Sequence, residues 1–314
     1  MLALPKVGFR RSVKTHNCDL TVVCDWIEIS LAVDETEISQ QAINDILVEQ
    51  GVYDKGDADA ATMRATFIGR IWDELRRRGG LAGQSAHYEV RPHRLVRVAN
   101  SSRLLPAFFL LCLCCSEYYE VLNAEPLSDY GKQGRLFEEF CSVSLSGQGW
   151  KVARTGWTST TGAKKLKATV QSVMAATSED AIQESWVSVY GDKNEAGCDL
   201  VSFLSYPDGF VGRPLILLQC ASGADYKTKL GTPDLGLWRK LITFSVAPQR
   251  GFCTPRSFEP DPFLATAGQV DGWLLERHRL LRPFATGATE LPKSLANELR
   301  KWLRPRFKAM PRLR

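Results

Sequence analysis

Two apolar segments in the second half of the chain constrain its fold more than any other feature of the sequence. Residues 199–204 (DLVSFL) and 214–220 (PLILLQC) are rich in aliphatic side chains and predict two buried strands. A helix is predicted before them at 135–145, a short strand at 150–154, and a helix after them at 225–244. Helix, strand, strand, strand and helix in this order predict a mixed α/β domain.

The first part of the chain predicts a separate α+β module. Residues 20–33 (LTVVCDWIEISLAV) are β-branched and apolar and predict a strand, and helical spacing follows at 35–50 and 59–78. Residues 87–99 predict a basic strand. The apolar run at 104–115 is too short to span a bilayer and predicts a buried helix.

The end of the helix predicted at 59–78 carries three consecutive arginines, Arg76, Arg77 and Arg78. Two glycines follow at 79–80, as expected at a helix C-terminus. Because cations stabilise the last turn of a helix, we interpret the arginines as a solvated helix end; contact with phosphates is the alternative.

A segment rich in turn-forming residues at 123–134 marks the predicted domain boundary. We therefore expect an N-terminal module over 1–128, a second domain over 129–290 and a basic helix or tail over 291–314. The overall class is α/β (α+β). We assign recognition or partner contact to the N-terminal module.

The charge of the chain is concentrated at its C-terminal end. The net charge is +5, and residues 298–314 contain seven Lys or Arg and one acid, so this segment carries about +6 and the other 297 residues sum to about −1. A basic segment on a near-neutral body predicts an acidic partner, nucleic acid rather than a membrane. Trp302 lies within it, either to stack on a base or to pack on the body. The candidate nucleic-acid contacts are Arg300, Lys301, Arg304, Arg306 and Lys308.

The nine cysteines predict a reducing compartment. Their number is odd and most lie among apolar residues, which is typical of reduced thiols that serve as small apolar side chains. The first residues, MLALPKVGFRR, lack the long apolar region of a signal peptide. We therefore expect a cytoplasmic protein.

Three polar residues stand at positions that the apolar pattern does not explain. Glu138 lies on the predicted helix, Asp199 opens the first apolar strand after a glycine, and Gln219 ends the second. If the two strands pair, Asp199 and Gln219 lie near each other at one end of the sheet. Two carboxylates and an amide carbonyl are hard oxygen ligands that suit Mg²⁺, which activates water near a phosphodiester.

These segments resemble the Mrr-like branch of the PD-(D/E)xK nuclease superfamily. Residues 134–138 match its G-x-x-F-E helix, residues 195–200 match its acidic-x-G-x-D-aliphatic motif, and residues 219–221 match part of its Q-x-K motif. The resemblance covers about 110 residues, roughly a third of the chain. It implies a restriction-endonuclease-like core that cleaves DNA with Mg²⁺ or Mn²⁺. It also implies a role in prokaryotic restriction or defence, with protein partners in a defence complex. The sequence does not distinguish DNA from RNA.

The resemblance assigns Glu138, Asp199 and Gln219 to the metal and the catalytic site, with Glu139 as the alternative to Glu138. The superfamily places a lysine where this chain has Ala221.

Two lysines follow that position closely. Lys227 and Lys229 are candidates for a displaced lysine, because a lysine stem spans several ångströms; we favour Lys229. The alternative is a degenerate site in a nucleic-acid-binding protein or in a scaffold subunit of a defence or repair complex.

Overall fold

The computed structural model divides the chain into two compact units. Unit 1 contains Met1–Asp129 together with Ala296–Arg314, and unit 2 contains Tyr130–Leu295. The division lies inside the predicted boundary segment, but the last residues form part of unit 1 instead of a separate tail. The structure describes residues 1–9, 18–53, 58–99, 102–155, 157–158, 162–163, 166–181 and 196–313.

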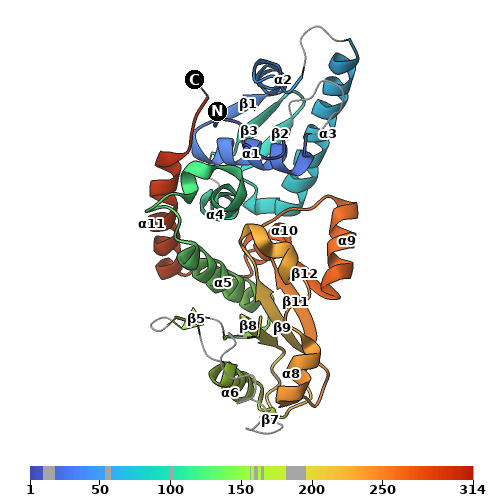
Figure 1. Ribbon diagram of the computed structural model, residues 1–314, viewed down its shortest axis with the longest axis vertical. Helices are drawn as coiled ribbons and strands as arrows, with labels where there is room; N and C mark the ends of the chain where they lie inside the picture. Colours follow the sequence, from blue (N-terminus) through green and yellow to red (C-terminus); the bar gives the residue numbers. More distant parts are fainter. Residues whose placement is uncertain are drawn as a thin grey trace. The chain divides into compact units, whose positions relative to one another are not determined.

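Unit 1 combines helices with a small antiparallel sheet of order β1-β3-β2. Figure 1 shows this sheet among the helices at the N-terminal end of the colour scale. The elements are α1 (Leu20–Val33), β1 (Glu37–Ser39), α2 (Gln40–Glu49), α3 (Ala58–Ala82), β2 (Tyr88–Arg91), β3 (Arg94–Arg97), α4 (Leu104–Leu113) and α11 (Lys293–Ala309).

Helix α1 corrects the strand predicted at 20–33. The Asp19 side chain caps the helix by accepting hydrogen bonds from the backbone N–H groups of Thr21, at 2.9 Å, and Val22, at 3.2 Å. Almost every residue of α1 is buried. A helix buried on all sides shows no 3.6-residue alternation, so its β-branched residues resembled a strand.

The other predictions for unit 1 differ from the structure mainly at their ends. The helix predicted at 35–50 begins at Gln40, after β1, and the basic strand at 87–99 is the hairpin of β2 and β3. Helix α3 continues through both glycines to Ala82, so the predicted stop is wrong. The buried helix at 104–115 is confirmed as α4. Within the described part of the chain, no helix is long and apolar enough to cross a membrane.

Arg78 is buried in unit 1 and is not part of a solvated helix end. Its side chain is 0% exposed. Its Nη1 donates to Asp25 Oδ1 at 2.8 Å and to Glu28 Oε2 at 2.9 Å, and its Nε donates to Glu74 Oε1 at 2.8 Å. The Tyr88 hydroxyl adds a 2.8 Å hydrogen bond to Glu28 Oε1. One guanidinium therefore joins α1 to α3 by compensating buried acids from both helices.

Unit 2 is built on a five-stranded mixed sheet of order β12-β11-β9-β8-β4. Strands β12, β11 and β9 run parallel, whereas β8 is antiparallel to both of its neighbours. The sheet strands are β4 (Lys151–Arg154), β8 (Leu200–Phe203), β9 (Leu215–Cys220), β11 (Gln249–Cys253) and β12 (Gly272–Leu275). The main helices are α5 (Tyr130–Gly147), α6 (Leu166–Thr177), α8 (Leu235–Leu241), α9 (Pro260–Val270) and α10 (Arg277–Ala285).

The predicted α/β class and the strands at 150–154, 199–204 and 214–220 are confirmed in unit 2. The single helix predicted at 225–244 is wrong. A 3₁₀ helix at Ala224–Lys229 is followed by Pro233, which has no N–H to donate to a continuing helix. Helix α8 then begins anew, with Asp234 as its N-cap.

Helices cover the two faces of the unit 2 sheet unequally. Helix α5 packs on the face formed by β4, β8 and β9, with α10 beside it (Figure 1). Apolar residues of α6 and α8 pack with Leu215 and Leu217 of β9 and Val201 of β8 on the other face. Because side chains alternate along a strand, Leu218 and Cys220 point toward α5, and Gln219 points away from it.

We predict that Arg78→Met destabilises unit 1 by about 3–5 kcal/mol, because three acids lose their buried counter-ion. Arg76→Met is the matched control, since Arg76 is 52% exposed and its ion pair with Asp73 contributes at most about 1 kcal/mol. Urea denaturation of the full chain measures the loss of unfolding free energy in both variants. Equal losses in the two variants would contradict the role given to Arg78.

The same variants have a predicted pH dependence. Burial alone raises the pKa of Glu74, but hydrogen bonds from Arg77 and the charge of Arg78 outweigh it, and the net pKa is lowered. A lowered pKa stabilises the fold above the ordinary pKa of the group, and this contribution is lost as pH falls through the lowered value. The stability difference between wild type and Arg78→Met therefore shrinks at acid pH.

Candidate functional site

Four strand ends meet at one edge of the unit 2 sheet. Because β8 runs antiparallel to β4 and β9, it begins near their ends: Leu200 pairs with Arg154 and with Leu218. Strand β11 ends at the same edge as β9. The backbone continues this contact, since Asp199 N donates to Leu218 O and Thr155 N donates to Asp199 O, both at 2.8 Å. The edge therefore gathers polar side chains from segments far apart in sequence.

Asp199 and Gln219 lie together at this edge. Gln219 Nε2 donates to Asp199 Oδ2 at 2.5 Å, and the backbone N–H of Cys220 donates to the same oxygen at 2.6 Å. Asp199 is 7% exposed. The adjacency expected from strand pairing is therefore present.

A tight turn closes around the Gln219 amide. Thr232 Oγ1 donates its proton to Lys229 O at 2.6 Å, and it lies 3.3 Å from Gln219 Oε1. Gly197, two residues before Asp199, has φ +69°, and a Cβ there would lie 3.2 Å from Gln219 Oε1. The glycine of the acidic-x-G-x-D motif thus allows the loop to approach the amide. Glu195, the acid of that motif, lies outside the described residues.

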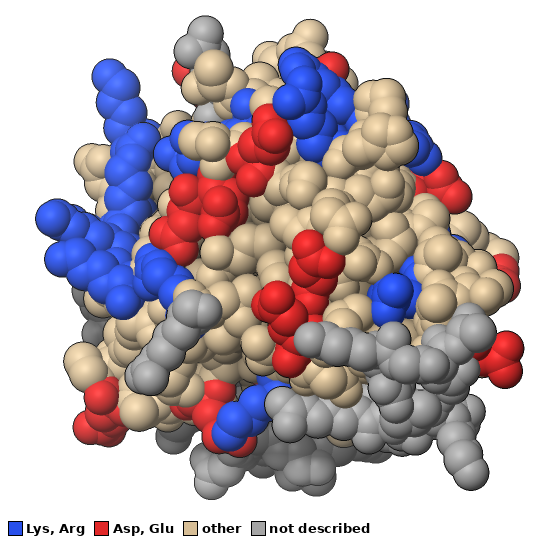
Figure 2. Space-filling view, turned by 90° about the horizontal axis from the view of Figure 1, so that it is seen from above, with Lys and Arg blue, Asp and Glu red and all other residues tan. Residues whose placement is uncertain are grey.

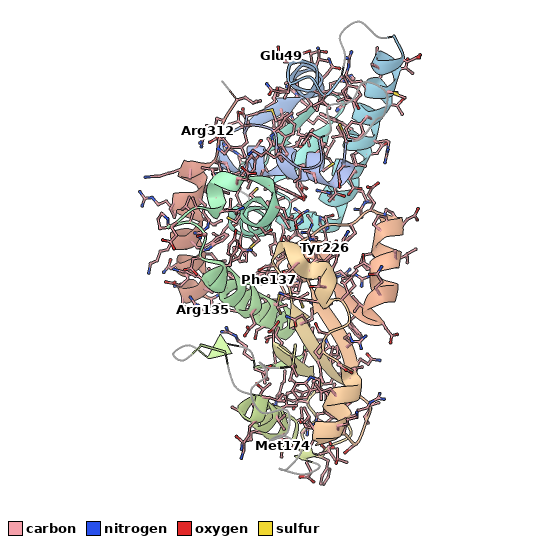
Figure 3. The ribbon with its side chains drawn as sticks, viewed as in Figure 1. Glu49, Arg135, Phe137, Met174, Tyr226 and Arg312 are labelled. Atoms are coloured by element: carbon pink, nitrogen blue, oxygen red, sulfur yellow. The ribbon has the colours of Figure 1, made fainter. Side chains whose placement is uncertain are left out.

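Glu138 reaches the edge from α5 and is held by Arg154. The Glu138 side chain is 2% exposed, and its Oε1 accepts a hydrogen bond from Arg154 Nε at 3.0 Å. Glu139 is 30% exposed, and its Oε2 lies 3.6 Å from Arg154 Nη1. Of the two adjacent acids, Glu138 is therefore the buried one. Figure 3 shows Phe137 on the side of α5 next to the sheet and Arg135 on the opposite side.

Arg154 was not predicted as a site residue from the sequence. The available signal was a charged residue at the end of the strand predicted at 150–154. In the antiparallel register Arg154 pairs with Leu200, and Leu200 pairs with Leu218. Alternation therefore places Arg154 and Glu138 on the α5 face, and Asp199 and Gln219 on the other face. The predicted ligands reach one sheet edge from opposite faces.

The candidate lysines lie on the 3₁₀ helix after β9. Lys229 Nζ forms an ion pair with Asp225 Oδ2 at 3.0 Å, and the two side chains are 41% and 59% exposed. Lys227 is exposed. Ala221 is 2% exposed and belongs to an apolar cluster with Tyr226. At position 221, where the motif has lysine, this chain therefore has a buried alanine of the apolar core. Lys229 pairs with Asp225 at the surface.

Three cysteines meet behind the strand ends. The Sγ atoms of Cys141 on α5, Cys220 on β9 and Cys253 on β11 all lie within 4.8 Å of one another. Burial raises the pKa of the Cys141 and Cys220 thiols. Hydrogen bonds from these two thiols lower the pKa of Cys253 to about 5. No spacing in the sequence indicates this cluster, because only the fold brings the three residues together.

Comparisons with protein-family models, curated proteins and solved structures found no match. The geometry brings Asp199 and Gln219 together and places Glu138 at the same sheet edge.

Helix α11 presents a basic face, but one predicted contact residue is not on it. Arg306 is 4% exposed; its Nη1 donates to Trp302 O at 2.8 Å, and its guanidinium lies 4.1 Å from the Trp302 ring centroid. Trp302 is 1% exposed and packs edge-on against Phe108, so it does not stack on a base. Figure 2 shows Lys and Arg side chains gathered at one edge of the face that it draws. The exposed cations of α11 among the candidates are Arg300, Lys301, Arg304 and Lys308.

We predict that Gly197→Ala destabilises unit 2 more than Gly209→Ala does. Both glycines have positive φ, +69° and +73°, so each substitution costs about 1–2 kcal/mol of backbone strain. Only at Gly197 does the new Cβ also lie 2.8 Å from Thr232 Cβ, whereas nothing lies within 4 Å at Gly209. Urea denaturation compares the two variants; equal losses would show that the loop does not press against Thr232 and Gln219.

Proposed function

We propose that unit 2 is a metal-dependent nuclease core that hydrolyses phosphodiester bonds in DNA, on the restriction-endonuclease-like plan that its motifs resemble. The observation that carries the proposal is the hydrogen bond between Gln219 and Asp199 at adjoining strand ends. These are the two strand residues that the motifs pair. Their adjacency is independent of the motif match, because it follows from the strand register. We further propose a role in prokaryotic defence, on the resemblance alone.

The donor groups at the sheet edge fit Mg²⁺ or Mn²⁺ in their chemistry. Asp199 and Glu138 supply carboxylate oxygens, and Gln219 supplies an amide carbonyl, all hard ligands. Gln219 directs Nε2 toward Asp199 and Oε1 toward Thr232. Exchanging the two ends of the amide directs the carbonyl toward Asp199, and the Thr232 hydroxyl can serve either end because it both donates and accepts. When bound, such a cation activates water and neutralises charge that develops on the phosphoryl oxygens.

The other residues of the edge then position these ligands. Arg154 holds the Glu138 carboxylate by its 3.0 Å hydrogen bond. Thr232 holds the Gln219 amide. The exposed ion pair of Lys229 with Asp225 contributes at most about 1 kcal/mol, so a phosphate oxygen can replace the Asp225 carboxylate at little cost. Lys229 is therefore our candidate for the cation that contacts the phosphodiester.

A catalytically degenerate nucleic-acid-binding subunit is the second candidate function. The observation that favours it is the buried position of Ala221, where the resembled motif has lysine. In this alternative Lys229 keeps its ion pair with Asp225, and the edge binds a phosphodiester without cleaving it.

A plasmid-cleavage assay with Mg²⁺, Mn²⁺ or EDTA tests the proposal. We expect metal-dependent cleavage by the wild type, and a loss on the order of a hundredfold or more in Asp199→Asn. Asparagine keeps an acceptor oxygen for the Cys220 N–H, so we expect a melting temperature close to that of the wild type. Asp208→Asn is the matched control, because Asp208 lies on an exposed loop.

The outcomes of this assay separate the two functions. Wild-type cleavage with full activity in Asp199→Asn would contradict the site assignment. DNA binding without cleavage in any metal would favour the degenerate subunit. Cleavage in EDTA would exclude a metal-dependent mechanism.

We also propose that the exposed cations of α11 contact DNA phosphates. The triple variant Arg300→Gln, Arg304→Gln and Lys308→Gln should then weaken DNA binding and flatten its salt dependence. The slope of the logarithm of the binding constant against the logarithm of the salt concentration should change by about 0.9 for each lost contact with duplex DNA. Fluorescence anisotropy over a salt series measures it.

A control variant with the same change in charge tests whether the position of these cations matters. Arg76→Gln, Arg91→Gln and Arg94→Gln remove three exposed cations from α3, β2 and β3. A slope that changes equally in both triple variants would indicate a general charge effect. An unchanged slope in the α11 variant would show that this face contacts something other than DNA.

A further inference from the structure

The three-cysteine cluster of unit 2 has no part in the proposed nuclease chemistry. Cys141, Cys220 and Cys253 come from a helix and two strands, and their sulfur atoms lie within 4.8 Å of one another. Cys220 and Cys253 are register partners on parallel strands, and α5 covers them from one face. Among the described residues, no other group of three His, Cys, Asp or Glu side chains brings its ligand atoms so close.

Three buried cysteines of unit 1 are placed differently. Cys112, Cys114 and Cys115 lie in one apolar segment, close together in sequence. In the unit 2 cluster, three sulfur atoms from separate elements converge instead. Apolar packing between a helix and a sheet requires no such convergence, and alanine or valine would fill the same space without reactive thiols.

We infer that Cys141, Cys220 and Cys253 form a three-thiolate site for a thiophilic d¹⁰ cation, Zn²⁺ or Cu(I). Soft thiolates select such cations, whereas Mg²⁺ prefers oxygen ligands. A tetrahedral zinc site with Zn–S bonds of about 2.3 Å places its sulfur atoms about 3.8 Å apart. The three Sγ atoms lie within 4.8 Å of one another, so each S–S distance is at most about 1 Å longer than in such a site. Small side-chain rotations close this difference.

The number of ligands bears on which cation is bound. No fourth Cys, His, Asp or Glu among the described residues joins the group. Three thiolates complete a trigonal Cu(I) site, whereas Zn²⁺ needs a fourth ligand from outside these side chains. Both cations share the same ligands, so separate titrations distinguish them.

A cation at this site would connect α5 to β9 and β11. Helix α5 carries Glu138, and the backbone N–H of Cys220 donates to Asp199 Oδ2 at 2.6 Å. The thiolate site would therefore fix the elements that carry the acids. Because Cys220 and Gln219 point to opposite faces of the sheet, the thiolate site is separate from the Asp199–Gln219 pair. Its existence does not depend on nuclease activity.

The test is a metal titration of the full chain after reduction and removal of metal. The chain competes with a chromophoric chelator for Zn²⁺ in one arm and for Cu(I) in the other. We expect one cation per chain in at least one arm, unaffected by excess Mg²⁺. Cys141→Ala, Cys220→Ala and Cys253→Ala should each bind about a hundredfold more weakly or worse, because losing even an outer partner of a metal ligand costs 10–100-fold. Cys112→Ala should bind like the wild type, although Cys112 is as buried as Cys141 and Cys253.

A second measurement on the wild type keeps the inference testable if a variant fails to fold. Cys18 and Cys220 are the two cysteines of intermediate exposure. Bound cation should slow alkylation of Cys220, mapped by mass spectrometry, at least tenfold and leave Cys18 unchanged, since a thiolate that ligates a metal is not free to react. Equal alkylation of Cys220 with and without either cation, or unchanged affinity in a folded Cys253→Ala variant, would overturn the inference.

Discussion

The carboxylate oxygen Oδ2 of Asp199 holds together the polar end of the unit 2 sheet. The ladder between β8 and β9 ends at the pair Leu200 and Leu218, and beyond it the backbone N–H of Cys220 finds its acceptor in this side chain. The same oxygen orients the Gln219 amide. Asp199 therefore fixes both the Gln219 side chain, which lies next to Thr232, and the backbone of Cys220, which pairs with Cys253. An aspartate here serves the fold whether or not the edge also binds a metal.

The two units compensate buried charge in different ways. In unit 1 one arginine, Arg78, faces acids from two helices and is wholly enclosed. In unit 2 the partly exposed Arg154 faces the buried Glu138. A closed network fixes packing, because no solvent can replace a missing partner. An ion pair with one solvated member can rearrange when a ligand arrives, which suits a binding site.

The sequence predicted those elements whose pattern depends on their own residues. Strands β8 and β9 have apolar segments bounded by turn residues, and the adjacency of Asp199 and Gln219 follows once these strands pair. Three other features depend on distant contacts. Helix α1 has no periodicity of apolar residues, because neighbouring elements surround it. Arg306 can be buried because its guanidinium donates hydrogen bonds to the backbone oxygens of Trp302 and Leu127. The cysteine cluster joins residues whose spacing has no pattern.

Unit 1 is built from both ends of the chain, and this has a kinetic consequence. Leu2 forms an isolated bridge with Arg312, Ala3 N donates to Pro311 O at 2.9 Å, and α11 places Leu299 and Trp302 in the unit 1 core. Unit 2 is one continuous stretch, Tyr130–Leu295. Residues 130–295 are synthesised before residues 296–313, so unit 1, although it begins first, is the later of the two units to have all its residues. The apolar surface that α11 covers stays open longest, and in this interval a nascent chain is most exposed to aggregation.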